Sequence, residues 1–176
     1  MRIVMISKKI GNFNILTIKN YNYFIKHELN LFELQCSCGC KGNLVRHGYY
    51  KRRVKTPLGT ITLRILRVKC KSCGKTHAVL PANIIPYSQV PLESMIKIVR
   101  SPLKSKEVVE ILNQNYDITE SDVSNIKRRF KKYWYQRLLS INLSLFESVD
   151  TIFKSCYSNY LRQFMQIKCN CSYIFS

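Results

Sequence analysis

Acidic residues are scarce in this sequence, and one long stretch has none. The 176 residues contain 10 Asp and Glu against 29 Lys and Arg, which gives a formal net charge of +19 at pH 7. Between Leu34 and Leu92 there is no acidic residue, although eleven Lys and Arg lie between Lys41 and Lys75. Clustered positive charge attracts phosphate polymers in a salt-dependent manner. The charge therefore favours a nucleic acid as the partner.

Long apolar runs and an export signal are also missing. No run of about 18 apolar residues occurs, and the longest uncharged segment, residues 78–92, is interrupted by three prolines. The apolar stretch after Met1 is too short for a signal peptide and is followed by lysines. Eight cysteines in a chain without such a signal are typical of reduced thiols or metal ligands. We therefore expect no membrane partner and a bacterial, cytoplasmic and nucleoid-associated protein.

The sequence contains no recognisable catalytic constellation. A DNA-cleaving site with two metal ions needs several carboxylates, but most acidic residues after Leu92 belong to expected helices, where they cap the helix or balance its charge. Only Glu147 and Asp150 lie beyond those helices. A nucleophile–base pair and a phosphate-binding glycine loop are missing as well. The sequence predicts a binding protein and not an enzyme.

Two cysteine clusters are the most specific motif present. The first reads Cys36-Ser37-Cys38-Gly39-Cys40, and the second reads Cys70-Lys71-Ser72-Cys73-Gly74. Two short Cys pairs on glycine turns, separated by about thirty residues, are typical of a tetrahedral thiolate zinc site. The sequence thus predicts one bound Zn²⁺ within a zinc ribbon over residues 36–80.

The identity of the second ligand stays open. Cys70 and Cys73 have the standard spacing, whereas Cys36 and Cys38 are one residue too close and Cys36 and Cys40 fall inside the usual gap. Spacing alone therefore favours Cys40 over Cys38. His47 and His77 are near enough to replace a thiolate, but we expect them to be hairpin-surface or core residues.

The residues between the clusters predict a β-hairpin. One strand covers 44–55, a turn follows at 56–59, and the return strand alternates, with Ile61, Leu63 and Ile65 on one face. Leu66 breaks this alternation, which suggests a bulge. Residues 81–91 then form a proline-rich connector.

From residue 92 to 139 the periodicity becomes helical. Helices are predicted over 93–100, over 106–112 with Ser105 as cap, and over 120–139 with Thr119 and Asp122 forming a capping box. The last two helices, joined by a short turn, have the pattern of a helix-turn-helix. The expected fold is therefore α+β, a zinc-ribbon hairpin followed by a helix-turn-helix.

A basic and polar set of residues is predicted to contact DNA. Asn and Arg near the start of a recognition helix suit base edges, and a run of Lys and Arg suits phosphates. The predicted contact residues on the hairpin and the last helix are Arg46, Lys51, Arg52, Arg53, Ser121, Ser124, Asn125, Lys127, Arg128, Arg129, Lys131 and Lys132.

The two ends of the chain are less informative. Residues 1–35 contain β-prone runs at 3–6, 13–18 and 21–25 and predict a short strand-rich segment. Residues 140–176 begin with an amphipathic pattern, expected to be helical over 141–153. Cys156, Cys169 and Cys171 have no suitable ligand spacing, so we expect them to be structural or incidental.

Two segments resemble a known family. Residues 38–52, CGCKGNLVRHGYYKR, and residues 66–81, LRVKCKSCGKTHAVLP, are similar to an uncharacterised bacterial domain found in transposase-like proteins. That family in turn resembles the N-terminal zinc ribbon of insertion-sequence transposases. The resemblance covers residues 33–135, although the family's usual Cys-Pro-x-Cys is absent here. It implies Cys36, Cys38, Cys70 and Cys73 as the ligands.

These observations predict a non-catalytic, zinc-dependent protein that binds duplex DNA, as the recognition part of a mobile element. Two alternatives remain. The 11 Tyr residues would allow stacking on single-stranded bases in an RNA-binding protein. The apolar pattern over 141–153 would allow a protein-interaction module that forms a homodimer.

Overall fold

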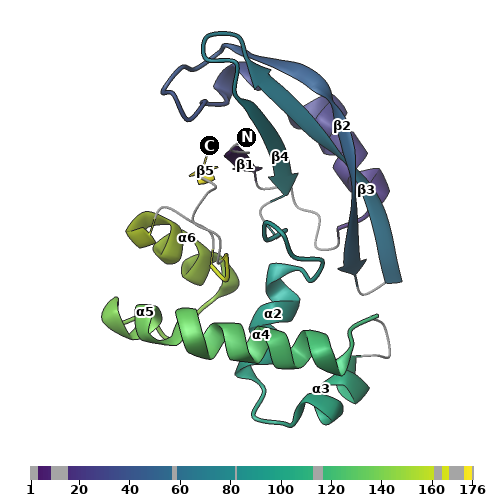
Figure 1. The fold of residues 1–176 in the computed structure, drawn as a ribbon, viewed down its shortest axis with the longest axis vertical. Helices are drawn as coiled ribbons and strands as arrows, with labels where there is room; N and C mark the ends of the chain where they lie inside the picture. Colours follow the sequence, from purple (N-terminus) through teal and green to yellow (C-terminus); the bar gives the residue numbers. More distant parts are fainter. Residues whose placement is uncertain are drawn as a thin grey trace.

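The fold joins a curved β-sheet to a layer of helices (Figure 1). The computed structural model describes residues 4–8, 16–56, 59–81, 83–112, 117–160, 164–166 and 173–175. The sheet has five strands in the order β2-β3-β4-β1-β5, of which β2, β3 and β4 are antiparallel. The α+β class is confirmed. Within the described residues, none of the helices combines the length and apolarity needed to cross a bilayer.

The predicted hairpin is present. Strand β2 covers Leu44–Thr56 and β3 covers Gly59–Cys70. Leu63 and Ile65 are fully buried, and Arg64 between them is exposed, as the alternation predicted. The bulge lies on β2 and not at Leu66, because the register shifts between Arg46 and Tyr49 and leaves two β2 residues opposite Arg67. Gly48, with φ 82°, provides the left-handed conformation needed there.

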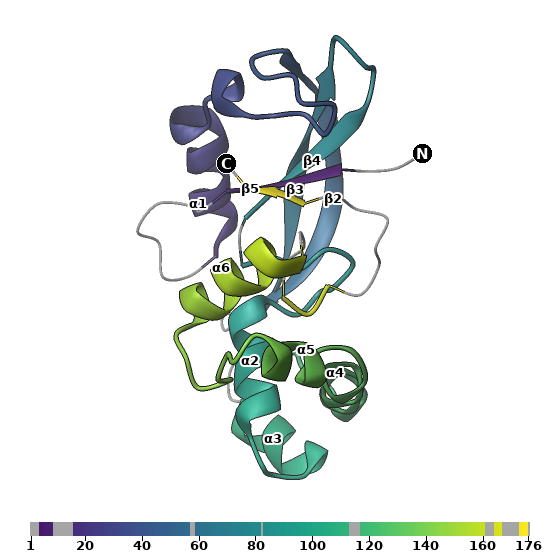
Figure 2. The same cartoon turned by 90° about the vertical axis from the view of Figure 1, so that its left-hand side faces the viewer.

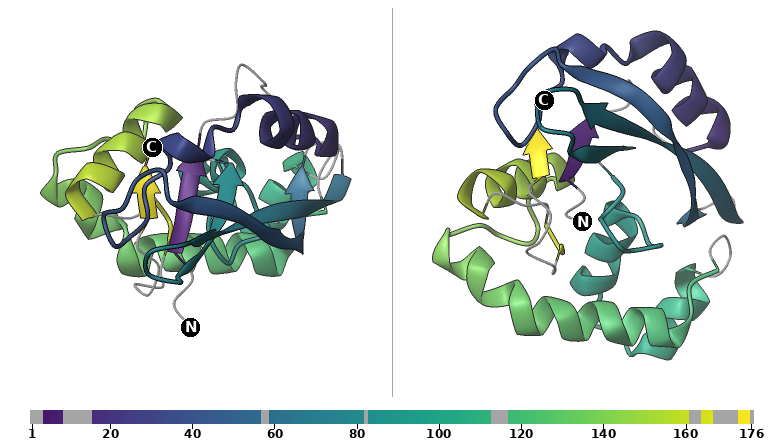
Figure 3. Two further views of the ribbon diagram at one scale, coloured as in Figure 1. Left: turned by 90° about the horizontal axis from the view of Figure 1, so that it is seen from above. Right: turned by 45° about the horizontal axis from the view of Figure 1, so that its top comes forward.

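Strand β4, Thr76–Pro81, was not predicted; it lies at the end of the segment expected to be a zinc ribbon and reaches the first residue of the predicted connector. All six of its residues are buried, so the strand has no polar face and no alternation by which the sequence could reveal it. It pairs with β3 on one side and in parallel with β1, Val4–Lys8, on the other. The last strand, β5 at Tyr173–Phe175, lies parallel to β1, so the two ends of the described chain are neighbours (Figure 3).

The strand-rich prediction for residues 1–35 is wrong between residues 18 and 28. Helix α1 covers Ile18–Tyr23 and continues into a π-helical turn, η1, at Phe24–Glu28, and a 3₁₀ turn, η2, covers Leu31–Glu33. Tyr21, Phe24 and Ile25 are buried at the spacing of one helical face. This face packs on one side of the sheet (Figure 2). Of the other expected strands, Val4–Lys8 forms, and residues 13–15 lie outside the described part of the chain.

Tyr21 occupies the point where β3 and β4 separate. These strands pair from Lys69 to Arg67, and Leu66 and Val79 would be the next partners. The Tyr21 hydroxyl instead accepts from the Leu66 N–H at 3.0 Å and donates to the Val79 carbonyl at 3.1 Å. Burial raises the pKa of this phenol above its ordinary value. The Tyr21 hydroxyl therefore takes the place of the backbone hydrogen bond that Leu66 and Val79 would otherwise form between β3 and β4.

Tyr21→Phe should lower the free energy of unfolding by about 2–4 kcal/mol, because two buried backbone groups lose their partner at a cost of about 1–3 kcal/mol each. Urea denaturation measures this change. Tyr135→Phe is the control, since its side chain is 47% exposed. Equal losses in the two variants would show that the bridging hydroxyl contributes no particular stability.

The helical layer follows in chain order. Helix α2 covers Leu92–Arg100, and α3 covers Ser105–Leu112. Helix α4 covers Glu120–Tyr133, and both α2 and α3 pack against it. The predicted helix 120–139 is interrupted at the fully buried Trp134, after which α5 covers Tyr135–Ser140.

The C-terminal prediction needs a larger correction. Residues 141–148 form turns, with Asn142 at φ 50°, and α6 begins at Val149 and ends at Tyr160. Of the apolar helix predicted over 141–153, on which the dimer hypothesis depended, only residues 149–153 are helical. Ile152 and Phe153 are buried inside the protein.

Helix starts were predicted with mixed success. The Thr119–Asp122 capping box forms as predicted. Ser105, however, is the first residue of α3 and its hydroxyl contacts that of Ser124, while Glu107 accepts from the Lys104 N–H. The N-terminal end of α3 is therefore stabilised by a carboxylate in its first turn.

The tip of the hairpin is attached to the helical layer. Lys55 forms an ion pair with Asp122 at the start of α4, and Thr60 donates to Asp117. Burial opposes ionisation of Asp122, but the hydrogen bonds from Lys55 and Thr119 outweigh it and lower the pKa of this carboxyl. These contacts fix the position of α4 relative to the hairpin.

Candidate metal centre and basic surfaces

Each cysteine cluster folds into a tight turn closed by its own backbone. In the first turn the Cys36 N–H donates to the Cys40 carbonyl, and the Gly39 N–H donates to the Cys36 carbonyl. In the second turn the Gly74 N–H donates to the Cys70 carbonyl. Gly39 and Gly74 have φ of 90° and 70°, which favours glycine at both positions. The first turn thus repeats the second with one residue fewer between its cysteines.

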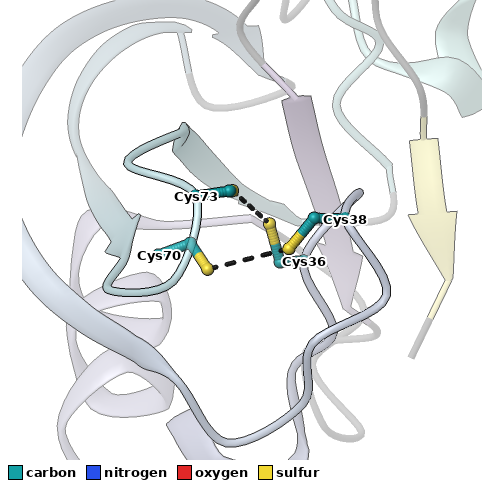
Figure 4. Close-up of side chains that lie close together, drawn as sticks. All are labelled: Cys36, Cys38, Cys70 and Cys73. Carbon is teal, nitrogen blue, oxygen red and sulfur yellow. Dashed lines mark hydrogen bonds between the residues drawn. The ribbon is translucent and has the colours of Figure 1, made fainter.

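The two turns bring four sulfur atoms together. The Sγ atoms of Cys36, Cys38, Cys70 and Cys73 all lie within 4.8 Å of one another (Figure 4). Cys36 Sγ is 3.5 Å from Cys73 Sγ, and Cys38 Sγ is 3.9 Å from Cys70 Sγ. A tetrahedron of thiolates with metal–sulfur bonds of about 2.3 Å has edges of about 3.8 Å. The donors therefore fit a four-coordinate thiolate site.

This geometry selects Cys38 over Cys40 as the second cysteine of the first turn. Cys40 is not one of the clustered residues, and its carbonyl closes the turn. The structure thus brings together the four cysteines implied by the resemblance and leaves Cys40, which spacing alone favoured, outside the cluster. Cys156 is buried elsewhere, and Cys169 and Cys171 lie outside the described residues.

Backbone N–H groups favour thiolates at two of the four positions. The Cys40 N–H lowers the pKa of Cys38 to about 6. Burial opposes ionisation of Cys70, but N–H groups of Cys73 and Ser72 outweigh it, so that the pKa of this thiol is below its ordinary value. Burial raises the pKa of Cys36 to about 12. A cation held by the cluster would favour the ionised form of Cys36, because thiolates are the ligand form.

His77 lies directly behind the cluster. Its Nε2 atom is 3.1 Å from Cys36 Sγ, and the residue is completely buried on β4. Burial, assisted by the nearby charge of Lys75, lowers the pKa of His77 to about 4. The expectation of a core residue is thus met, with a direct sulfur contact that the sequence did not indicate. His47 is exposed on β2.

The predicted hairpin contacts divide into two groups. Lys51 and Arg53 are exposed on the face that also carries Arg64, whose guanidinium stacks 5.1 Å from the ring centroid of Tyr49. Arg52 points to the opposite face and donates to the carbonyls of Ile85 and Ser88 at 2.6 and 2.7 Å. The guanidinium of Arg46 donates to the Ile25 carbonyl at 2.9 Å. Arg46 and Arg52 therefore stabilise the fold, and Lys51 and Arg53 face solvent.

The α4 residues divide in the same way. The amine of Lys127 donates to the carbonyls of Ser101 and Leu103, which ties α4 to the segment after α2. The remaining exposed basic residues of the helix are Arg128, Arg129, Lys131 and Lys132. Asn125 forms a polar chain with its neighbours, donating to Ser121 and accepting from Arg128. Ser121, Ser124, Asn125 and Arg128 thus share the outer side of the first turns of α4.

Residues 36–122 match the family model of a domain of unknown function. The chain carries a DUF6431 domain. The DUF6431 domain contains both cysteine turns, the hairpin, β4, α2 and α3, and it ends at the capping residue Asp122. Nothing in this match connects the domain with transposases or zinc ribbons, so that part of the resemblance stays a prediction. No curated protein and no solved structure matches the chain.

Proposed function

We propose that this protein is a non-catalytic DNA-binding protein whose cysteine cluster holds Zn²⁺ and whose helix α4 lies in the major groove of duplex DNA. The metal would have a structural role, holding the two cysteine turns at the open end of the hairpin. Four thiolates in tetrahedral reach of one another are the donor set typical of structural zinc. Its role would be that of the recognition part of a mobile element, an idea that rests on the resemblance of two segments to an uncharacterised domain of transposase-like proteins.

The observation that carries the proposal is the arrangement of charge on α4. Arg128, Arg129, Lys131 and Lys132 are exposed on one short helix, whereas the acidic residues Asp117 and Asp122 beside its start are engaged by Thr60 and Lys55. The first turns of α4 therefore present Asn125 and Arg128, with Glu120 as the remaining exposed carboxylate at the helix start. Asn and Arg make bidentate contacts with adenine and guanine edges.

The hairpin supports the same orientation. Its exposed Lys51 and Arg53 belong to a strand pair that is joined to the start of α4 through Lys55 and Asp122. A duplex that receives α4 in its major groove would meet a second basic surface held at a fixed distance. Contacts from this surface would go to phosphates and carry no base preference.

Arg128→Ala and Lys131→Ala test the proposed division of roles. Selection from random duplexes first defines a preferred site, and fluorescence anisotropy then measures affinity. Arg128→Ala should cost about 1–3 kcal/mol at that site and relax the base preference, and Lys131→Ala should weaken all sequences alike.

Lys154→Ala is the charge-matched control, because Lys154 is exposed on α6, away from the proposed interface. Affinity that is indifferent to Arg128 would refute the recognition role. Tighter binding of single-stranded RNA than of duplex DNA at equal salt would favour the RNA alternative.

A further inference from the structure

A pocket of about 410 Å³ lies between α4 and the turn formed by residues 85–88. Its apolar walls include Ile85, Met95, Ile126 and Met165. Sites for small organic ligands have volumes of about 300–1,000 Å³ and combine apolar walls with a few polar groups. The pocket is therefore large enough for one small ligand, it contains none of the clustered cysteines, and it shares Arg128 with the outer side of α4.

The polar part of this pocket is strongly basic. Arg128, Arg129 and Lys132 all line it, and none of the described lining residues is acidic. Arg129 and Lys132 are exposed, so their charged groups are accessible to a ligand. The three cations lie within about one turn of α4, with Lys132 three and four residues after the two arginines, and such a cluster suits the oxygens of a phosphate group.

Two tyrosines line the same pocket. Tyr87 is 55% exposed, although its neighbours in the turn, Ile85 and Pro86, are buried. Tyr133 is half-buried, and the Lys132 amine lies 5.1 Å from its ring centroid. Exposed aromatic rings beside cations are the features by which proteins bind unstacked nucleobases. The pocket therefore offers complementary groups for both halves of a nucleotide.

Backbone strain is concentrated at this pocket. Among the described residues, only Tyr87, Asn142 and Met165 have positive φ without being glycine, and two of these three line the pocket. For a bulky residue such as Tyr87, with φ 63°, this conformation costs on the order of 1 kcal/mol or more. Such strain persists only where the surroundings enforce it.

The surroundings of Tyr87 do enforce it. The Arg52 guanidinium donates to the carbonyls of Ile85 and Ser88, on both sides of Tyr87. The Lys55 N–H also donates to the Gln89 carbonyl, so strand β2 holds the turn at two points. Strand β2 thus holds the backbone of the turn that places Tyr87 in the lining of the pocket.

We propose that this pocket binds a single unpaired nucleotide, with its phosphate held by Arg128, Arg129 and Lys132 and its base against Tyr87. The nucleotide can be free or part of a strand, since both present the same phosphate and base. The proposal goes beyond duplex recognition and does not depend on it, because the pocket accepts a mononucleotide without any contact from the hairpin's outer face.

The test uses the full chain with adenosine 5′-monophosphate as probe, in low salt, by isothermal titration calorimetry. We expect 1:1 binding, with adenosine and inorganic phosphate each at least about 10-fold weaker, because each offers only half of the recognised groups. A single-stranded oligonucleotide and a duplex with one unpaired base distinguish the strand from the free nucleotide as the source. The strand is the natural ligand if either binds at least about 10-fold more tightly than the monophosphate.

Three variants connect the binding to this pocket. Arg129→Ala should weaken the monophosphate about 10-fold, because a charge-assisted contact is lost. Tyr87→Gly should weaken it by a similar factor while the melting temperature is kept or raised, because glycine accepts the left-handed backbone. Asn142→Gly is the matched control at a positive φ outside the pocket, and it should leave the affinity unchanged.

Unchanged affinity in both Arg129→Ala and Tyr87→Gly would overturn the proposal, as would monophosphate binding no tighter than that of inorganic phosphate. Duplex binding that is lost in Arg128→Ala but kept in Tyr87→Gly would show that the duplex uses Arg128, which the two sites share, without the base contact at Tyr87. If the duplex does not bind at all, the proposed function fails. The pocket proposal is still tested by the affinity of the monophosphate for the wild type and for the variants Arg129→Ala and Tyr87→Gly.

Discussion

Replacing Cys70 and Cys73 together with serine is expected to abolish metal binding and to unfold the sheet. These residues supply half of the four-sulfur cluster, and two remaining thiolates cannot hold a structural metal ion tightly. The free energy of zinc binding in small modules, about 10–16 kcal/mol, is comparable with or larger than the total stability of a domain, about 5–15 kcal/mol. Native mass spectrometry should show one zinc lost, and circular dichroism should show lost strand signal.

Cys38→Ser and Cys40→Ser form a matched pair for this result. The same chemical change is made two residues apart, yet only Cys38 belongs to the cluster. Cys38→Ser should release the metal and Cys40→Ser should retain it, and Cys36→Ser should behave like Cys38→Ser. Retention of metal in the Cys70/Cys73 double variant, or an equal loss in the variants at 38 and 40, would refute the ligand set. Removal of metal by a chelator should reproduce the double variant.

Raising the salt concentration from 50 to 200 mM should weaken the binding of duplex DNA by about 10³-fold. The exposed basic residues of the hairpin face and α4 are Lys51, Arg53, Arg64, Arg128, Arg129, Lys131 and Lys132. Each phosphate that they neutralise releases counterions, so the logarithm of the affinity should fall linearly with the logarithm of the salt concentration. With about six contacts the slope should be about −5.

Variants on the two elements show whether both contribute to this slope. Lys51→Ala and Lys131→Ala should each make the slope shallower by about one unit, because each removes one phosphate contact. Lys154→Ala should leave it unchanged. Arg46 and Arg52 are excluded from the count because their guanidinium groups donate to backbone carbonyls. A nearly flat salt dependence in the wild-type protein would contradict binding through phosphates.

The sequence predicted those parts of the fold whose signals are local. The hairpin was predicted by period-2 alternation around Leu63, and the start of α4 by Thr119 and Asp122, three residues apart. Strand β4 was missed because burial on both faces removes any alternation. Helix α1 was missed because Tyr, Phe and Ile have high strand propensity, and their i, i+3, i+4 placement gains its meaning only from packing on the sheet.

The sequence predicted a cluster of cysteines and left open whether Cys38 or Cys40 belongs to it. The sequence did contain the signal for Cys38, since Gly follows Cys38 as it follows Cys73, but ligand counting alone favoured Cys40. The contact between His77 and Cys36, and the pocket between Tyr87 and α4, could not be predicted, because each joins residues about forty positions apart through tertiary structure. Local pattern carries no information on such pairs.

The pairing of β1 with β5 has a consequence for the order of assembly. Val4–Lys8 leaves the ribosome more than 160 residues before its partner Tyr173–Phe175. Closing so long a segment is slow compared with forming the hairpin, because distant contacts require more of the chain to be ordered first. During synthesis the nascent chain therefore carries β1 with an unpaired edge. That edge is the place where a chaperone or the strand of a second nascent copy would add.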